Sequence, residues 1–271
     1  MSICFDKASA RFSREYLDEL YHKYNHREYI SPDPLEFVWL YDDPLEREIV
    51  GLIASALAYG RVAQIKKSVS GVLEKMGPSP RAFIEDASGD LLLQVFEGFK
   101  HRFTTAFELA DFILGIRQVI FLHGSLERCF TSLLESTHDS TIHALGGFVQ
   151  ELRTHFPDGY NSLLPHPEKK SACKRLHLFL RWMVRHDNVD PGVWDGVSPS
   201  LLIVPLDTHM YSICSGLNMT CRAAADIKTA EEITARFRDI IPGDPVKYDF
   251  SMTRLGIRPD AERSFAGRHY A

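Results

Sequence analysis

The stretch Leu202-Ile203-Val204-Pro205-Leu206-Asp207-Thr208-His209-Met210 marks the clearest structural junction in this chain. A short apolar run meets a proline, and an aspartate then precedes the first residues of a helical pattern. An aspartate in that position accepts hydrogen bonds from the unpaired amide groups at the start of a helix. The stretch therefore predicts a helix that begins at Thr208 and is capped by Asp207.

The same helical periodicity recurs along the rest of the chain. Gly77-Pro78 closes one such segment, and Asp244-Pro245 opens another, with an aspartate as cap and a proline in the first turn. No run alternates apolar and polar residues between hairpin turns, so the sequence predicts an all-α fold. The predicted helices are Arg14–Tyr24, Leu45–Tyr59, Val62–Met76, Pro80–Asp86, Leu91–Phe99, Ala106–Leu122, Leu126–Leu134, Ile142–His155, Ala172–His186, Thr208–Leu217, Ala230–Ile240 and Pro245–Leu255.

We expect the chain to form a single all-α unit, residues 1–271, with two lobes and a soft boundary near residues 157–168. The longest irregular stretch, Pro157 to Pro167, separates an N-terminal set of helices from the segment that leads to Asp207. A second loop runs from Asp187 to Ser200. The sequence therefore predicts a cleft between two helical lobes.

The composition, with 45% hydrophobic and 25% charged residues, is ordinary for a soluble globular protein. No apolar run is long enough to cross a bilayer, and the N-terminus lacks the basic start and apolar centre of a secretory signal. The five cysteines are odd in number and scattered along the chain, which favours a reducing cytoplasm over a disulfide scaffold. Their spacing is not that of metal ligands. We expect a cytoplasmic monomer with no cofactor, no metal and no membrane contact.

One segment of the chain is strongly basic, although the net charge of -5 provides no long-range attraction for nucleic acid. From residue 169 to residue 185 there are six lysines or arginines and no acidic residue. A local cationic strip of this kind can bind phosphates, and a solvated helix face is the other interpretation. The candidate contacts to a DNA backbone are Lys169, Lys170, Arg175, Arg181, Arg185 and His209.

Asp207 and Lys174 supply a carboxylate and an amine, the two groups that amine-based glycosidic chemistry needs. The start of a helix favours the ionised form of a carboxylate, and that form stabilises the cation created at a sugar C1′ when its base departs. An amine becomes a nucleophile where burial or neighbouring cations favour its neutral form. Lys169 and Lys170 are rival amines, and helix capping alone is the other role open to Asp207.

Two motifs resemble those of a known superfamily. The run Leu202–His209 resembles the V-D-T-H segment of the helix-hairpin-helix (HhH-GPD) DNA glycosylases, whose aspartate is the catalytic carboxylate at a helix start. Gly51-Leu52-Ile53-Ala54-Ser55-Ala56-Leu57-Ala58-Tyr59-Gly60 resembles their early buried helix, which ends at the base pocket. The chain lacks the glycine-rich hairpin before Asp207 and iron–sulfur cysteines after it. The resemblance implies a two-lobed helical glycosylase-like fold with a degenerate or missing helix-hairpin-helix motif.

A closer likeness is to the archaeal branch of the superfamily that removes oxidised guanine. Lys174-Arg175-Leu176-His177-Leu178-Phe179-Leu180-Arg181-Trp182 resembles the lysine-bearing helix of that branch. The resemblance implies a DNA repair enzyme that excises a damaged, oxidised purine and has abasic-site lyase activity, with Lys174 as Schiff-base nucleophile and Asp207 as its activator. Over nearly its full length the chain also resembles a bacterial family of unknown function, through residues 33–38, 179–185 and 244–250.

If these roles hold, damaged duplex DNA is the partner, and the damaged nucleotide rotates out of the helix into the cleft. The base-pocket candidates are Tyr59, Arg61, Gln64, Leu178 and Trp194. Tyr59 has the alternative of a helix-end aromatic packed on the core. Trp182 is expected in the core because it lies on a helix, whereas Trp194 lies on a loop and is more open to a binding role.

Two other classes of function are open. His138-Asp139 and His186-Asp187 are dipeptides of the kind that holds the metal in HD-type phosphohydrolases, although both fall at loop positions. A glycosylase scaffold without its hairpin is also compatible with a catalytically inactive, nucleic-acid-binding or structural relative. The glycosylase mechanism requires the Lys174 amine and the Asp207 carboxylate to lie within about 8 Å of each other in one cleft.

Overall fold

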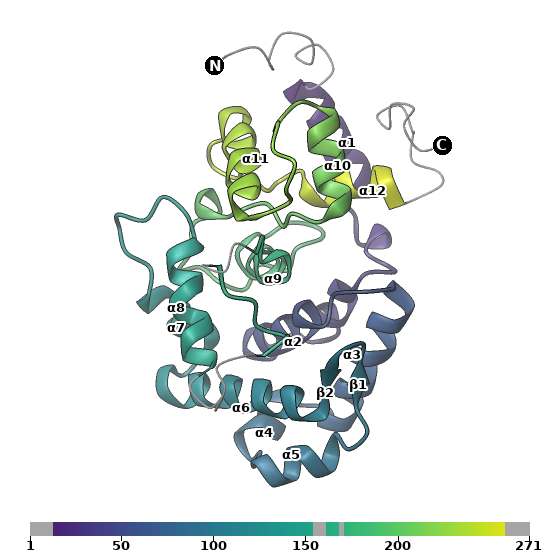
Figure 1. The fold of residues 1–271 in the computed structure, drawn as a ribbon, viewed down its shortest axis with the longest axis vertical. Coiled ribbons are helices and arrows are strands. Elements are labelled where there is room, and N and C mark those ends of the chain that lie inside the picture. The colour runs from purple at the N-terminus through teal and green to yellow at the C-terminus, as the bar shows by residue number, and fades with distance from the viewer. Residues whose placement is uncertain (1–12, 154–160, 168–170, 258–271) are drawn as a thin grey trace.

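The computed structural model describes residues 13–153, 161–167 and 171–257 of the chain. Helices dominate these ranges, and the strands within them form one short antiparallel hairpin (Figure 1). The predicted all-α class is therefore confirmed. The elements are α1 (Arg14–Tyr24), η1 (Arg27–Tyr29), η2 (Pro34–Leu40), α2 (Pro44–Ala56), α3 (Val62–Met76), α4 (Pro80–Glu85), α5 (Gly89–Val95), β1 (Lys100–His101), β2 (Thr104–Thr105), α6 (Ala106–His123), α7 (Leu126–Ser132), α8 (Ile142–Leu152), α9 (Lys174–Val184), η4 (Pro199–Leu201), α10 (Thr208–Gly216), α11 (Ile227–Ile240) and α12 (Asp249–Ile257).

The structure corrects the start of the predicted C-terminal helix. The sequence predicts its start at Pro245 with Asp244 as cap, but α12 begins at Asp249. The Asp244 carboxylate instead accepts a hydrogen bond from Arg185 Nε at 3.0 Å. The Asp244 side chain, which the local pattern predicts as a helix cap, therefore pairs with the distant Arg185.

Helix α2 is the central buried helix. Asp43 caps it by accepting a hydrogen bond from the Leu45 amide, and Pro44 occupies its first turn. Every residue from Ile49 to Ala56 is buried, which is the pattern of a helix in a core rather than on a surface. Because α2 packs against α9 and η2, the residues after its C-terminal end have a fixed place beside α9.

Helix α9 is the partner of α2 in the core. All of its residues from Leu176 to Val184 are buried, and the first two, Lys174 and Arg175, are partly exposed. The predicted cationic helix is thus largely a core helix. Only its N-terminal end reaches the surface.

The helices gather in two groups around α2 and α9. Figure 1 shows α1, α10, α11 and α12 at one end of the molecule and α3 to α6 with the hairpin at the other. One hydrophobic cluster joins both groups, since it includes Leu17 of α1, Val69 of α3 and Phe237 of α11. Of the boundary predicted near residues 157–168, only residues 161–167 are described, so the division into lobes stays a prediction.

No single helix in the described ranges is long and apolar enough to cross a membrane. Helices α6 and α7 reach the required length and composition only as a pair, and they are bent by 70° relative to each other. Among the described cysteines, Cys129, Cys173 and Cys214 are buried free thiols, and Cys221 is disulfide-bonded.

Candidate functional site

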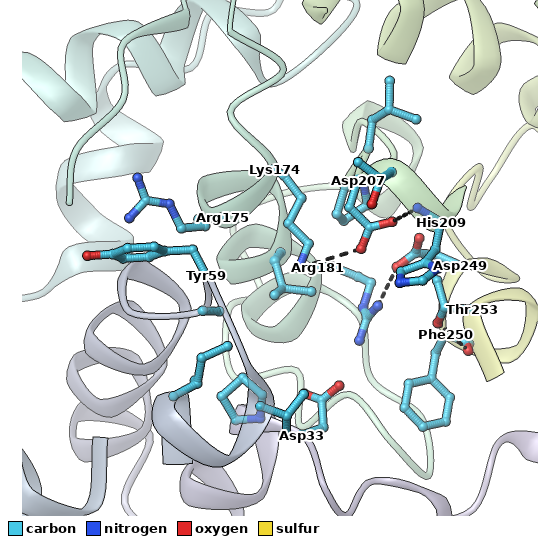
Figure 2. A pocket seen from close by; sticks show the side chains of 18 of the residues that line it. Asp33, Tyr59, Lys174, Arg175, Arg181, Asp207, His209, Asp249, Phe250 and Thr253 are labelled. Atoms are coloured by element: carbon cyan, nitrogen blue, oxygen red, sulfur yellow. Dashed lines mark hydrogen bonds and ion pairs between the residues drawn. The ribbon is translucent and has the colours of Figure 1, made fainter. Parts of the chain in front are cut away.

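A cavity of about 710 Å³ lies where the residues after α2, the residues before η2, and the beginnings of α9, α10 and α12 meet (Figure 2). Its lining brings together segments that are far apart in the sequence. Several charged side chains line it, and they form oppositely charged pairs. These pairs are Lys174 with Asp207, Arg181 with Asp249, and Arg254 with Asp33.

Asp207 is the N-cap of α10, as the sequence predicts. Its Oδ1 accepts hydrogen bonds from the amides of His209 at 3.0 Å and Met210 at 2.9 Å. Its other oxygen, Oδ2, faces the amine of Lys174 (Figure 2). The carboxylate therefore caps the helix with one oxygen and presents the second to the cavity.

Lys174 is the first residue of α9, directly after Cys173, whose backbone is left-handed with φ 44°. Its Nζ lies 3.9 Å from Asp207 Oδ2, with 29% of the Lys174 and 31% of the Asp207 side chain exposed. This separation is longer than a direct hydrogen bond, but one water or a small side-chain rotation can bridge it. The structure thus brings the predicted amine and carboxylate together.

The face of α9 that carries Lys174 continues into the cavity. Residues four and seven positions further along a helix lie on the same face, which here places Leu178 and Arg181 below Lys174. All three line the cavity. His209, at the start of α10, also lines it and is exposed.

Tyr59 follows the end of α2 and lines the cavity, as predicted for a pocket residue. Its hydroxyl donates a hydrogen bond to the His101 carbonyl at 2.9 Å, and burial raises the pKa of that hydroxyl. The guanidinium of Arg175 lies over its ring, 4.8 Å from the ring centroid. Arg175 also donates to the carbonyls of Ala56 and Ser162, so it links α9 to the end of α2, and its contact with a DNA backbone stays a prediction.

The predicted DNA-backbone contacts of Arg181 and Arg185 are wrong, because both side chains are buried. Their charges are compensated inside the protein, which is the condition under which a buried cation is tolerated. The acidic partners are Asp187, Asp190, Asp244 and Asp249. The other two predicted contacts in this segment, Lys169 and Lys170, lie outside the described residues.

Asp249 is a lining residue that sequence reasoning missed. It is 4% exposed, one of its oxygens pairs with Arg181, and its Oδ1 has no hydrogen-bond partner among the described residues. Burial raises the pKa of this carboxyl group. The only signal for it was its place in residues 244–250, a run that carries the likeness to the bacterial family. Figure 2 shows Asp249 between Arg181 and His209.

Three other pocket candidates do not line the cavity. Arg61 and Gln64, at the start of α3, are exposed and lie outside the lining. Trp194 is 3% exposed and donates a hydrogen bond from Nε1 to Glu48 at 3.0 Å. The expectation that its loop position leaves it open to a ligand is therefore wrong, whereas Trp182 is buried in the core as predicted.

The His-Asp dipeptides have local contacts of their own. His138 lies 4.0 Å from Glu135, and His186 Nδ1 lies 2.9 Å from the Pro191 carbonyl. Within the described ranges, no group of three or more His, Cys, Asp or Glu side chains is arranged to hold a metal ion. The geometry of these ranges therefore offers no support for the phosphohydrolase alternative.

Comparison with known proteins places the chain in one family. Residues 33–258 match the family model described as "Protein of unknown function (DUF2400)". No curated protein and no solved structure matches the chain. The matched range contains Lys174, Asp207 and Asp249, and with them nearly all of the cavity lining. Because the match covers most of the chain, this protein belongs to the DUF2400 family.

Proposed function

We propose that this protein is a DNA repair glycosylase that excises a damaged purine through an imine with Lys174 and has abasic-site lyase activity. The observation that carries the proposal is the separation of 3.9 Å between Lys174 Nζ and Asp207 Oδ2 at one cavity. The V-D-T-H-like segment and the lysine-bearing helix converge at that point. This is the pairing that the resemblance requires of a nucleophilic amine and the carboxylate that activates it.

The geometry supports a defined sequence of proton and bond changes. Asp207 Oδ2 first accepts a proton from the Lys174 ammonium, directly or through one water. The neutral amine then attacks C1′, and the electron pair of the C1′–N bond leaves with the base, which takes the proton from Asp207. Once the base has taken this proton, Asp207 is again a carboxylate, and it stabilises the positive charge of the secondary ammonium formed at C1′.

The lyase step follows from the same intermediate. The secondary ammonium at C1′ loses a proton, and the sugar ring opens to an imine as O4′ gains one. Removal of a C2′ proton then expels the 3′ phosphate with the C3′–O electron pair. Borohydride stops this sequence, because hydride adds to the imine carbon and converts the link to a stable amine.

The cavity has the features expected of a small-molecule pocket. Its volume of about 710 Å³ lies within the usual range for such sites. Tyr59 and Leu178 contribute apolar side chains to its lining, and Arg181 and Asp249 contribute buried polar groups. An extruded base can therefore find apolar and hydrogen-bonding contacts in it.

Borohydride trapping tests the proposal. The protein is incubated with duplex DNA that carries oxidised guanine or an abasic site, borohydride is added, and the covalent adduct is measured on a denaturing gel. We expect an adduct with the wild type, its loss in Lys174→Ala and its retention in Lys170→Ala. An adduct that persists in Lys174→Ala contradicts the assignment of the nucleophile.

The same assay separates catalysis from binding. The absence of an adduct on every lesion, together with weak salt-dependent DNA binding, favours the catalytically inactive nucleic-acid-binding alternative. The absence of any DNA binding at low salt contradicts both.

A further inference from the structure

The hairpin β1–β2 presents two side chains at the rim of the cavity. His101 pairs with Thr104 across the hairpin, so its turn consists of Arg102 and Phe103. His101 and Thr104 are fully buried, whereas Arg102 is exposed and the Phe103 side chain is 59% exposed. The Phe103 ring therefore offers apolar surface at the tip of the turn.

The hairpin is fixed to a residue that lines the cavity. The Tyr59 hydroxyl donates to the His101 carbonyl at 2.9 Å, and the His101 ring contacts the Tyr59 carbonyl at 3.0 Å. Thr104 Oγ1 adds a contact to Ser162 Oγ at 2.6 Å. The Phe103 ring stacks on the Tyr59 ring, with centroids 5.1 Å apart and planes inclined by 24°. The hairpin is therefore a rigid extension of the cavity wall.

The turn holds a charged side chain at a position that usually favours glycine. Arg102 has φ 54°, a left-handed conformation that is unfavourable for residues with a Cβ and is typically taken by Gly or Asn in tight hairpins. Its side chain lies over Gly60, which has φ 97° and where an added Cβ would lie 3.0 Å from Arg102 Cδ. Strain of this kind concentrates at functional positions.

The hairpin and the residue after Gly60 carry exposed cations. Arg61, Lys100 and Arg102 are all exposed, and none of the three forms an ion pair or a side-chain hydrogen bond within the described residues. This charge complements a phosphate backbone. Exposed cations beside the cavity are thus supplied by the hairpin and by the residue after Gly60, whereas Arg181 of α9 is buried.

We propose that the β1–β2 hairpin is a wedge that inserts Phe103 into duplex DNA, in the space vacated when a nucleotide rotates into the cavity. The ring lies outside the cavity lining but stacks on Tyr59, which belongs to it. Apolar side chains inserted between base steps stabilise a kinked duplex in other DNA-binding proteins. The wedge rests on the proposed function, because it assumes that the partner is a duplex with an extruded nucleotide.

The test uses a duplex that already lacks one base, so that the space for the Phe103 ring is open without extrusion of a nucleotide. Fluorescence anisotropy measures the dissociation constants for an intact duplex and for one with a tetrahydrofuran abasic analogue, which lacks the C1′ oxygen and cannot form an imine. We expect the wild type to prefer the analogue duplex, and Phe103→Ala to lower that preference roughly tenfold, the loss of one base–aromatic stacking contact. Phe103→Trp should retain the preference because it retains an aromatic ring.

The matched control is Phe121→Ala, which removes a phenylalanine from α6 that is 82% exposed. The wedge is wrong if the wild type shows no preference, if Phe103→Ala keeps the wild-type ratio, or if Phe121→Ala lowers it equally. Loss of borohydride trapping with an intact Phe103-dependent preference refutes the proposed chemistry alone. Normal trapping without that preference refutes the wedge alone.

Discussion

Substituting Asp207 by Asn separates the two roles of this side chain. The cap uses Oδ1, which accepts from the His209 and Met210 amides at 3.0 and 2.9 Å, whereas the proposed chemistry uses Oδ2. Asn caps helices as well as Asp does, so Asp207→Asn keeps the cap but replaces Oδ2 by an amide nitrogen that cannot accept a proton. Helix capping and catalysis therefore predict different results.

The expected magnitudes follow from the contacts. Asp207→Asn loses a charge–dipole contribution and a partly exposed ion pair with Lys174, together about 1 kcal/mol of unfolding free energy. Asp207→Ala also loses the cap, about 1 kcal/mol more. Removal of the proton acceptor should slow imine formation roughly 10²- to 10⁴-fold in both variants.

Urea unfolding measures the first quantity, and the single-turnover rate of borohydride trapping on an abasic duplex measures the second. A wild-type trapping rate in Asp207→Asn would refute the catalytic role. If Asp207→Asn lost as much unfolding free energy as Asp207→Ala, the assignment of capping to Oδ1 and of proton transfer to Oδ2 would be refuted.

The remaining predictions concern the core that positions the site. Glu48 accepts hydrogen bonds from the Trp194 indole and from two backbone amides at the start of α7, so Glu48→Ala should lower the unfolding free energy by about 3 kcal/mol in urea titrations; a loss below about 1 kcal/mol would contradict this. Burial raises the pKa of Glu48 to about 7 from 4.5. Between these two pH values the folded state keeps a proton on Glu48 that the unfolded state has lost. The free energy of unfolding should therefore fall by about 3 kcal/mol as the pH rises across this window. The fall should be absent in Glu48→Gln, and an equal fall there would assign it to other groups. A Cβ added to Gly115 would lie 2.0 Å from the Leu152 carbonyl oxygen, so Gly115→Ala should lower the unfolding free energy by about 3 kcal/mol or more. Gly71→Ala, on α3 with nothing within 4 Å of the added Cβ, should raise it by up to about 1 kcal/mol; similar values for both glycines would contradict the close α6–α8 contact.

Local patterns predicted what depends on neighbours in sequence. The helices at residues 14–24 and 62–76 have the predicted bounds, because their apolar spacing and end residues act within a turn or two. Asp207 was correctly predicted as a cap for the same reason. That Lys174 and Asp207 lie together was expected from the resemblance alone. The distance between Lys174 Nζ and Asp207 Oδ2 comes only from the structure.

Several errors involve partners that lie outside the segment from which the prediction was made. Arg185 was expected on the surface because residues 169–185 contain no acid, but it pairs with Asp187 and Asp190 in the loop that follows and with the distant Asp244. Trp194 lies on a loop, yet its indole meets the buried Glu48 of α2. Asp249 enters the cavity only because α12 packs beside α10. Composition and periodicity contain no information about such pairings.

Mapping the covalent adduct gives the most direct test of the central claim. The wild-type protein is trapped on an abasic duplex with borohydride and digested, and the cross-linked peptide is sequenced by tandem mass spectrometry. The amine-and-carboxylate mechanism predicts the reduced sugar on Lys174, with none on Lys169 or Lys170. An adduct confined to another lysine, or no adduct from any lesion-bearing duplex, would contradict it.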